Sequence, residues 1–81
     1  MQIEFELPDI GTEPNEEITV SFWHIEEDED FEEGDDILEV STKKSTINVP
    51  APSNGRLIEI LVQEGDVVTT GNTIAIIESE P

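Results

Sequence analysis

Hydrophobic and polar residues alternate along much of the chain, a pattern typical of half-buried β-strands. Near the start, Ile3, Phe5 and Leu7 alternate with polar neighbours. Turn residues recur roughly every 8–10 positions, and no apolar spacing of 3.6 residues is sustained. The pattern predicts one all-β domain over residues 1–81, a sandwich or barrel with strands at 3–7, 18–25, 36–41, 45–49, 56–62, 67–68 and 73–78.

The segment between the second and third predicted strands is dominated by carboxylates. An acidic turn is expected at 26–30 and another turn at 32–35, with Phe31 between them. This run lacks the regular ligand spacing and the glycine of a calcium loop. We therefore expect no metal site in it.

The two halves of the chain resemble each other. Placing Gly34 on Gly71, an offset of 71 − 34, or 37 residues, aligns Ile37 with Ile74 and needs no gaps. Such a repeat predicts a sandwich of two similar β units related by a pseudo-two-fold axis. The expected core residues are Trp23, Ile25, Ile37, Val40, Ile58, Ile60, Val62, Ile74 and Ile77.

The same repeat predicts where one short polar segment lies. The link between the halves should sit at one end of the molecule, with the two termini at the other. Residues 41–46, Ser-Thr-Lys-Lys-Ser-Thr, lie at or next to this link. The turn expected there should protrude from the end opposite Met1 and Pro81.

Composition narrows the possible functions. A chain of 81 residues buries only roughly 60–65% of its unfolded surface and has little room for a deep pocket. Without cysteine, thiol chemistry and zinc–thiolate sites are excluded, and His24 is the only histidine. No nucleophile–base pair or phosphate-binding loop is visible. We therefore expect a non-catalytic domain.

The charge is strongly negative and unevenly distributed. With 21 acidic residues the formal net charge is -18, which disfavours nucleic acids and anionic membranes as partners. The acidity suits partners with basic docking faces, or equally a solvated surface adapted to high salt. The only lysines, Lys43 and Lys44, are adjacent in the protruding turn, and Arg56 is the other permanent cation. This placement indicates a use for an exposed amine.

Several stretches resemble one family, in order along the chain. Residues 7–11, Leu-Pro-Asp-Ile-Gly, resemble the opening of lipoyl domains from the acyltransferase components of 2-oxo acid dehydrogenase complexes. Residues 36–52, with Thr-Lys-Lys-Ser at the tip and Pro-Ala-Pro after the second strand, are similar to that family's lipoylation hairpin. Its later landmarks are matched by residues 53–55, 58–62, 64–66, 71 and 74–78.

The resemblance implies both a fold and a site. The fold would be a flattened sandwich of two similar four-stranded antiparallel sheets, a barrel-sandwich hybrid. Lys44 matches the family's modified lysine, which implies lipoate attached there through an amide. Lys43 stands where the family usually has aspartate, and Ser45 where it has alanine. Lys43 is the second choice for the attachment.

The resemblance also implies a role for the domain. Its lipoyl arm would carry acyl groups and reducing equivalents between active sites. The implied partners are a lipoate-attaching enzyme, a thiamine-dependent decarboxylase, an acyltransferase core and dihydrolipoamide dehydrogenase. Asp36 and Glu39, near the base of the hairpin, are expected to help steer docking onto basic surfaces. The expected location is a prokaryotic cytoplasm, or the mitochondrial matrix after processing.

Two alternatives stay open. A biotin carrier domain has this fold, but its lysine normally lies between two methionines, and the only methionine here is Met1. The other alternative is an unmodified lipoyl-like module that binds proteins through its acidic faces. Lys43 in place of aspartate favours this second reading.

Overall fold

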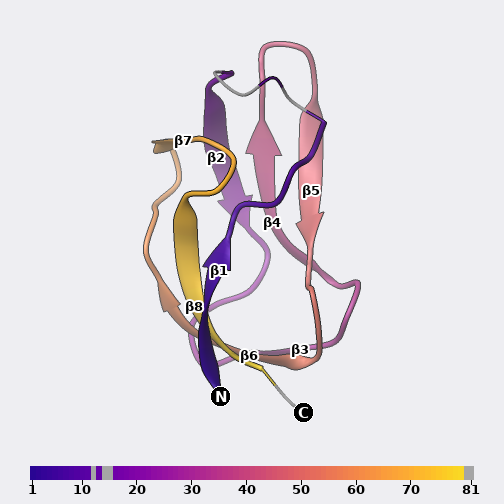
Figure 1. Cartoon of the computed structure of the whole chain (residues 1–81), viewed down its shortest axis with the longest axis vertical. Coiled ribbons are helices and arrows are strands. Elements are labelled where there is room, and N and C mark those ends of the chain that lie inside the picture. The colour runs from indigo at the N-terminus through magenta and orange to yellow at the C-terminus, as the bar shows by residue number, and fades with distance from the viewer. Residues whose placement is uncertain (12, 14–15, 80–81) are drawn as a thin grey trace.

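The computed structural model describes residues 1–11, 13 and 16–79, which form two antiparallel four-stranded sheets (Figure 1). Strands make up both sheets, which confirms the all-β prediction. Along this part of the chain no helix could cross a membrane. The strands are β1 (Gln2–Glu6), β2 (Ile18–Trp23), β3 (Asp30–Phe31), β4 (Asp36–Ser41), β5 (Thr46–Pro50), β6 (Gly55–Ile60), β7 (Val67–Val68) and β8 (Thr73–Ser79). Their order is β1-β8-β6-β3 in one sheet and β5-β4-β2-β7 in the other.

The internal repeat is visible in the irregularities of the sheets. Ser21 in β2 and Ile58 in β6 are each the extra residue of a β-bulge, at the same offset as the sequence repeat. Ile37 in β4 and Ile74 in β8 form a second pair of bulges at that offset. A bulge bends and twists its strand, so matching bulges curve the two sheets alike. The predicted pseudo-two-fold relation is confirmed.

The turns repeat in the same way. Gly34 and Gly71 both have positive φ, 89° and 93°. Asp28 adopts a φ of 73° where its repeat partner Gly65 has 93°, so the two turns share their backbone form although one lacks a glycine. Aspartate enters this left-handed region more readily than most residues.

Packing between the sheets forms the core. Four of the nine predicted core residues are almost completely buried, namely Ile37, Val40, Ile74 and Ile77. Trp23, Ile25, Ile60 and Val62 are half-buried and pack against the core from its edge. The other buried hydrophobic side chains of the core are Phe5, Leu7, Ile18, Val20, Phe31, Leu38, Val49, Ala51, Leu57, Val68 and Ala75.

One predicted core residue was wrong. Ile58 is also half-buried, but it is not among the half-buried residues that pack against the core, whereas its neighbour Leu57 is fully buried. Simple alternation along residues 56–62 groups Ile58 with Ile60 and Val62. The bulge at Ile58 takes up one residue, and this brings Leu57 to the inner face.

The predicted strands agree with the observed ones within a few residues, with one omission. β3 contains only Asp30 and Phe31, in the segment where the sequence predicted turns alone. It pairs with β6 through Asp30–Arg56 and Phe31–Gly55. Two residues are too few for alternation to be detected.

The hairpin of β4 and β5 projects from one end of the molecule, which measures 35 × 19 × 19 Å (Figure 1). The first residue lies at the opposite end, where the Met1 carbonyl accepts a hydrogen bond from the Ser79 amide at 3.0 Å. The turn at residues 41–46, which forms the tip of this hairpin, therefore protrudes from the end opposite Met1, as predicted (Figure 1). Pro81, the other end named in that prediction, lies outside the described residues.

Candidate functional site

The hairpin that carries the two lysines has a firmly anchored base. Its strands pair in register from Leu38–Val49 to Ser41–Thr46. Leu38, Val40 and Val49 are fully buried, so the inner face of both strands is fixed in the core. The tip therefore projects from a base that has little freedom to tilt.

Thr42 organises the tip itself. Its amide donates to the Ser45 carbonyl at 2.8 Å, which closes the turn. Its hydroxyl oxygen accepts hydrogen bonds from the Lys44 and Ser45 amides, both at 3.2 Å. A threonine hydroxyl commonly caps a turn in this way, because it replaces a backbone acceptor. The backbone conformation of the tip is thus held by hydrogen bonds to a single residue, Thr42.

Both lysine side chains are exposed, and neither is in an ion pair with any described residue. Arg56 behaves differently, because its Nε lies 2.9 Å from Asp30 Oδ1. That hydrogen bond, together with the negative charge of Asp30, raises the pKa of Arg56 above its ordinary value. The two unpaired cations of the described chain are therefore together at the hairpin tip.

A shallow groove of about 650 Å³ adjoins the tip. Its walls are the hairpin residues 41–44, Thr19 of β2, and three acidic residues of the segment before β2, Glu13, Glu16 and Glu17. The Glu16 amide donates to the Glu13 carbonyl at 3.0 Å, which links two of these acidic residues. No sequence pattern associates these acidic residues with the lysines, because only the fold brings the two segments side by side.

The two carboxylates expected near the hairpin base lie at different distances from the hairpin tip along β4. Glu39 is half-buried in β4 and pairs with Asn48 of β5 and Phe22 of β2 across the sheet. Asp36 is exposed at the far end of β4, opposite Pro50. Glu39 is therefore the nearer of the two to the tip.

The lone histidine lies on the outer face of the same sheet. His24 Nε2 is 2.9 Å from Asn48 Oδ1, and its ring meets Phe22 edge-on with 5.3 Å between ring centroids. Among the described residues no three histidine or acidic side chains are grouped so that they could hold a metal ion. His24 is thus held on this face by its contacts with Asn48 and Phe22.

Similarity to known proteins covers nearly the whole chain. Residues 3–77 match the family described as "Biotin-requiring enzyme" (Biotin_lipoyl). The dihydrolipoyllysine-residue acetyltransferase component of the pyruvate dehydrogenase complex of Bacillus subtilis is 38% identical over 74 residues, which cover 91% of this chain and 16% of the relative. The component of the same name from Staphylococcus epidermidis is 39% identical over 79 residues, which cover 98% and 18%. The chain spans less than a fifth of the length of these relatives.

Solved structures give a similar result. The lipoyl domain of the 2-oxoglutarate dehydrogenase complex of Azotobacter vinelandii has a TM-score of 0.73 at 28% identity, with 96% of this chain and 99% of that domain covered. A single-chain, multi-domain long-chain acyl-CoA carboxylase has a TM-score of 0.80 at 20% identity, with 99% of this chain and 7% of that chain covered. The second likeness concerns the fold alone.

Proposed function

The chain belongs to the Biotin_lipoyl family, and on this premise we propose that it is a swinging-arm carrier domain with lipoate attached to Lys44. One observation carries the proposal: an exposed lysine, unpaired among the described residues, at the tip of a hairpin anchored in the core. Lipoate rather than biotin is supported by the relatives, which are dihydrolipoyllysine acetyltransferases, and by the lipoyl domain of similar structure.

Two arguments favour Lys44 over Lys43 as the attachment residue. Lys44 matches the modified lysine of the lipoylation hairpin in sequence. Its backbone amide is also held by Thr42 Oγ1 at 3.2 Å, whereas no hydrogen bond within the described chain holds the Lys43 amide. A side chain on a tethered backbone position is presented in a reproducible direction to a modifying enzyme.

The residues at the tip suit an amide-linked group. The Lys44 side chain is surrounded by solvent, so an enzyme can enclose it without displacing packed residues. Acylation converts its ammonium into a neutral amide and leaves Lys43 as a cation beside it. When bound, lipoate supplies a dithiolane that accepts an acyl group and electrons. The protein supplies position, which raises the effective concentration of the arm at its partners' active sites.

The larger assembly follows from the relatives and is part of the proposal. The Bacillus and Staphylococcus relatives are named as components of pyruvate dehydrogenase complexes. We extend this to a 2-oxo acid dehydrogenase complex with a thiamine-dependent decarboxylase, an acyltransferase core and dihydrolipoamide dehydrogenase as partners. In such a complex the domain itself catalyses no step, and its hairpin tip visits each active site in turn.

Coexpression with a lipoate ligase tests the proposal. Intact mass and peptide mapping should detect one lipoyl adduct, located on Lys44. Lys44→Gln should abolish the adduct, whereas the matched Lys43→Gln variant, which loses the same charge one residue away, should retain it. Both lysines are exposed, so both variants should fold normally.

Three results would contradict parts of the proposal. An adduct on Lys43 would move the site by one residue. Biotin incorporated by a biotin ligase would change the cofactor. Absence of any adduct, under conditions that modify an established lipoyl domain, would favour the unmodified interaction module.

A further inference from the structure

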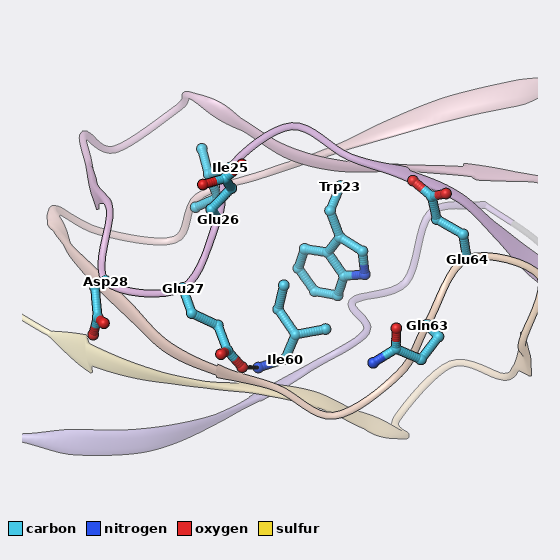
Figure 2. Close-up of a pocket in the computed structure, with 8 residues that line it drawn as sticks. All are labelled: Trp23, Ile25, Glu26, Glu27, Asp28, Ile60, Gln63 and Glu64. Atoms are coloured by element: carbon cyan, nitrogen blue, oxygen red, sulfur yellow. Dashed lines mark hydrogen bonds between the residues drawn. The ribbon is translucent and has the colours of Figure 1, made fainter.

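A second groove lies on the side of the molecule, between the turn after β2 and the turn after β6 (Figure 2). Its volume is about 810 Å³. Thr19 pairs with Ser41 beside the hairpin tip, and Trp23 is four residues further along β2, roughly 13 Å away. The groove is lined by Trp23, Ile25, Glu26, Glu27, Asp28, Ile60, Gln63 and Glu64.

The floor of the groove is apolar and rigid. Trp23, Ile25 and Ile60 are half-buried, because one side of each packs on the core and the other faces the groove. The Trp23 Nε1 donates to the Val62 carbonyl at 3.1 Å, which fixes the orientation of the indole. The only tryptophan of the chain thus presents part of its ring to solvent in a defined position.

The rim of the groove is acidic and has no cation. Glu26, Glu27, Asp28 and Glu64 all line it, and none of the described cations does, although Arg56 is near enough to interact electrostatically with Asp28. Clustered carboxylates repel one another, and a bound cation would relieve this repulsion.

The internal repeat makes two of these carboxylates distinctive. Glu27 and Glu64 are repeat partners, but only Glu27 has a structural task, since it accepts a hydrogen bond from the Ile60 amide at 2.8 Å. No hydrogen bond or ion pair from a described residue engages the carboxylate of Glu64 or that of Glu26. Figure 2 shows these two side chains on opposite sides of the Trp23 indole. The groove thus offers two free carboxylates and an aromatic surface between them.

We propose that this groove docks a basic segment of a partner protein, with an arginine side chain over Trp23 and between Glu26 and Glu64. This contact surface is separate from the hairpin tip and does not depend on modification of Lys44. It would tether a partner while leaving the tip free to enter an active site. Such a second contact raises the effective concentration of the tip.

Arginine fits the groove better than lysine does. A guanidinium is planar, stacks on an aromatic ring, and donates to two carboxylates through its fork of N–H groups. Apolar residues beside the arginine would contact Ile25 and Ile60. The negative rim repels anionic segments, so complementarity of charge selects the sign of the partner.

Trp23 provides a direct measurement, because it is the only tryptophan. The Lys44→Gln protein should be titrated with the blocked peptide acetyl-Leu-Arg-Ile-Arg-Leu-amide, and Trp23 fluorescence recorded. We expect a saturable change, absent with the peptide in which both arginines are replaced by citrulline. The peptide lacks tryptophan, so the signal arises from the groove.

Matched charge variants separate docking from general attraction. Glu26→Gln/Glu64→Gln should weaken binding about three- to tenfold, as expected for lost contacts of exposed charges with arginine. Glu6→Gln/Glu33→Gln removes the same charge from exposed positions outside the groove and should change binding by less than about twofold. Amide chemical shifts should move at Ile60 and Gln63.

Two outcomes would overturn the proposal. Equal weakening by the two double variants would mean that the peptide is attracted by net charge alone. Shift changes confined to residues 41–46, without a response of Trp23, would place the contact at the hairpin tip. Neither outcome affects the test of lipoate attachment, because that test measures the mass of the protein in which Lys44 is retained.

Discussion

At the scale of single residues, Thr42 has the clearest effect on the candidate site. One hydroxyl oxygen accepts two amide hydrogens, including that of Lys44, while the amide of the same residue closes the turn. Lys43 and Lys44 therefore differ in how firmly the backbone beneath them is held, although both are exposed. The difference arises from hydrogen bonding, because the two side chains are chemically identical.

Thr42→Val should loosen the tip while preserving the shape of the side chain. Two amides lose their acceptor and turn to water, so we expect unfolding by urea to show a loss of about 0.5–1.5 kcal/mol. The initial rate of lipoylation should fall with it. Thr42→Ser keeps the hydroxyl and should behave nearly as the unmutated protein. Similar behaviour of the valine and serine variants would contradict a role for the hydroxyl.

At the scale of elements, β6 occupies a crowded position between β3 and β8. Gly55 starts the strand, and it pairs with Phe31 on one side and Ser79 on the other. A Cβ at Gly55 would overlap the Glu78 carbonyl oxygen and lie 3.2 Å from Phe31 Cζ. The backbone of β8 can lie this close to β6 only because the residue at position 55 is glycine, which also leaves room for the Phe31 ring of β3.

Gly55→Ala should therefore disrupt the pairing of β6 with both neighbours. We expect a loss of about 2–3 kcal/mol in the free energy of unfolding, since a backbone carbonyl cannot move aside as a side chain would. Gly65→Ala is the matched control. A Cβ there meets open space, and only its φ of 93° is unfavourable, at about 1 kcal/mol. Equal losses in thermal or urea unfolding would show that crowding at Gly55 is unimportant.

At the scale of the whole molecule, electrostatic repulsion is the dominant unfavourable feature of the surface. A net charge of -18 is distributed over a body only 35 Å long, and two ion pairs join its described residues. The Debye length is about 30 Å at 0.01 M salt and about 3 Å at 1 M. In dilute buffer nearly every carboxylate therefore acts on every other, and in concentrated salt only close neighbours do.

The melting temperature should accordingly rise with sodium chloride. Between 0.01 M and 1 M we expect an increase of at least about 5 °C, which corresponds to roughly 1 kcal/mol for a domain of this size. Glu6→Gln/Glu33→Gln/Glu59→Gln removes three exposed charges and should reduce the increase. A melting temperature that does not depend on salt would contradict the argument.

The Arg56–Asp30 ion pair responds to pH in a defined direction. The pKa of Arg56 is raised in the folded state, so the contribution of its charge is fully present below the ordinary arginine value and is lost as pH rises through the raised value. The pair is exposed, at 54% and 74% of the two side chains, and its effect is correspondingly small.

Much of this protein follows from the sequence by itself. Alternation and turn residues predict strands, because they depend only on neighbouring residues. The offset that joins Gly34 to Gly71 predicts two similar sheets, since similar segments bury similar faces. The isolation of both lysines in one turn, together with the resemblance to lipoylation hairpins, marks Lys44 as the candidate for modification.

Only the tertiary structure decided what depends on contacts between distant segments. The bulge at Ile58, which buries Leu57 in its place, is set by the pairing of β6 with β8. The strand β3 exists because Phe31 meets Gly55, and Glu64 joins Trp23 in one groove because the two repeats pack together. Strands and turns can be predicted because they depend on residues adjacent in the chain, whereas these features depend on contacts between residues that are far apart in the chain.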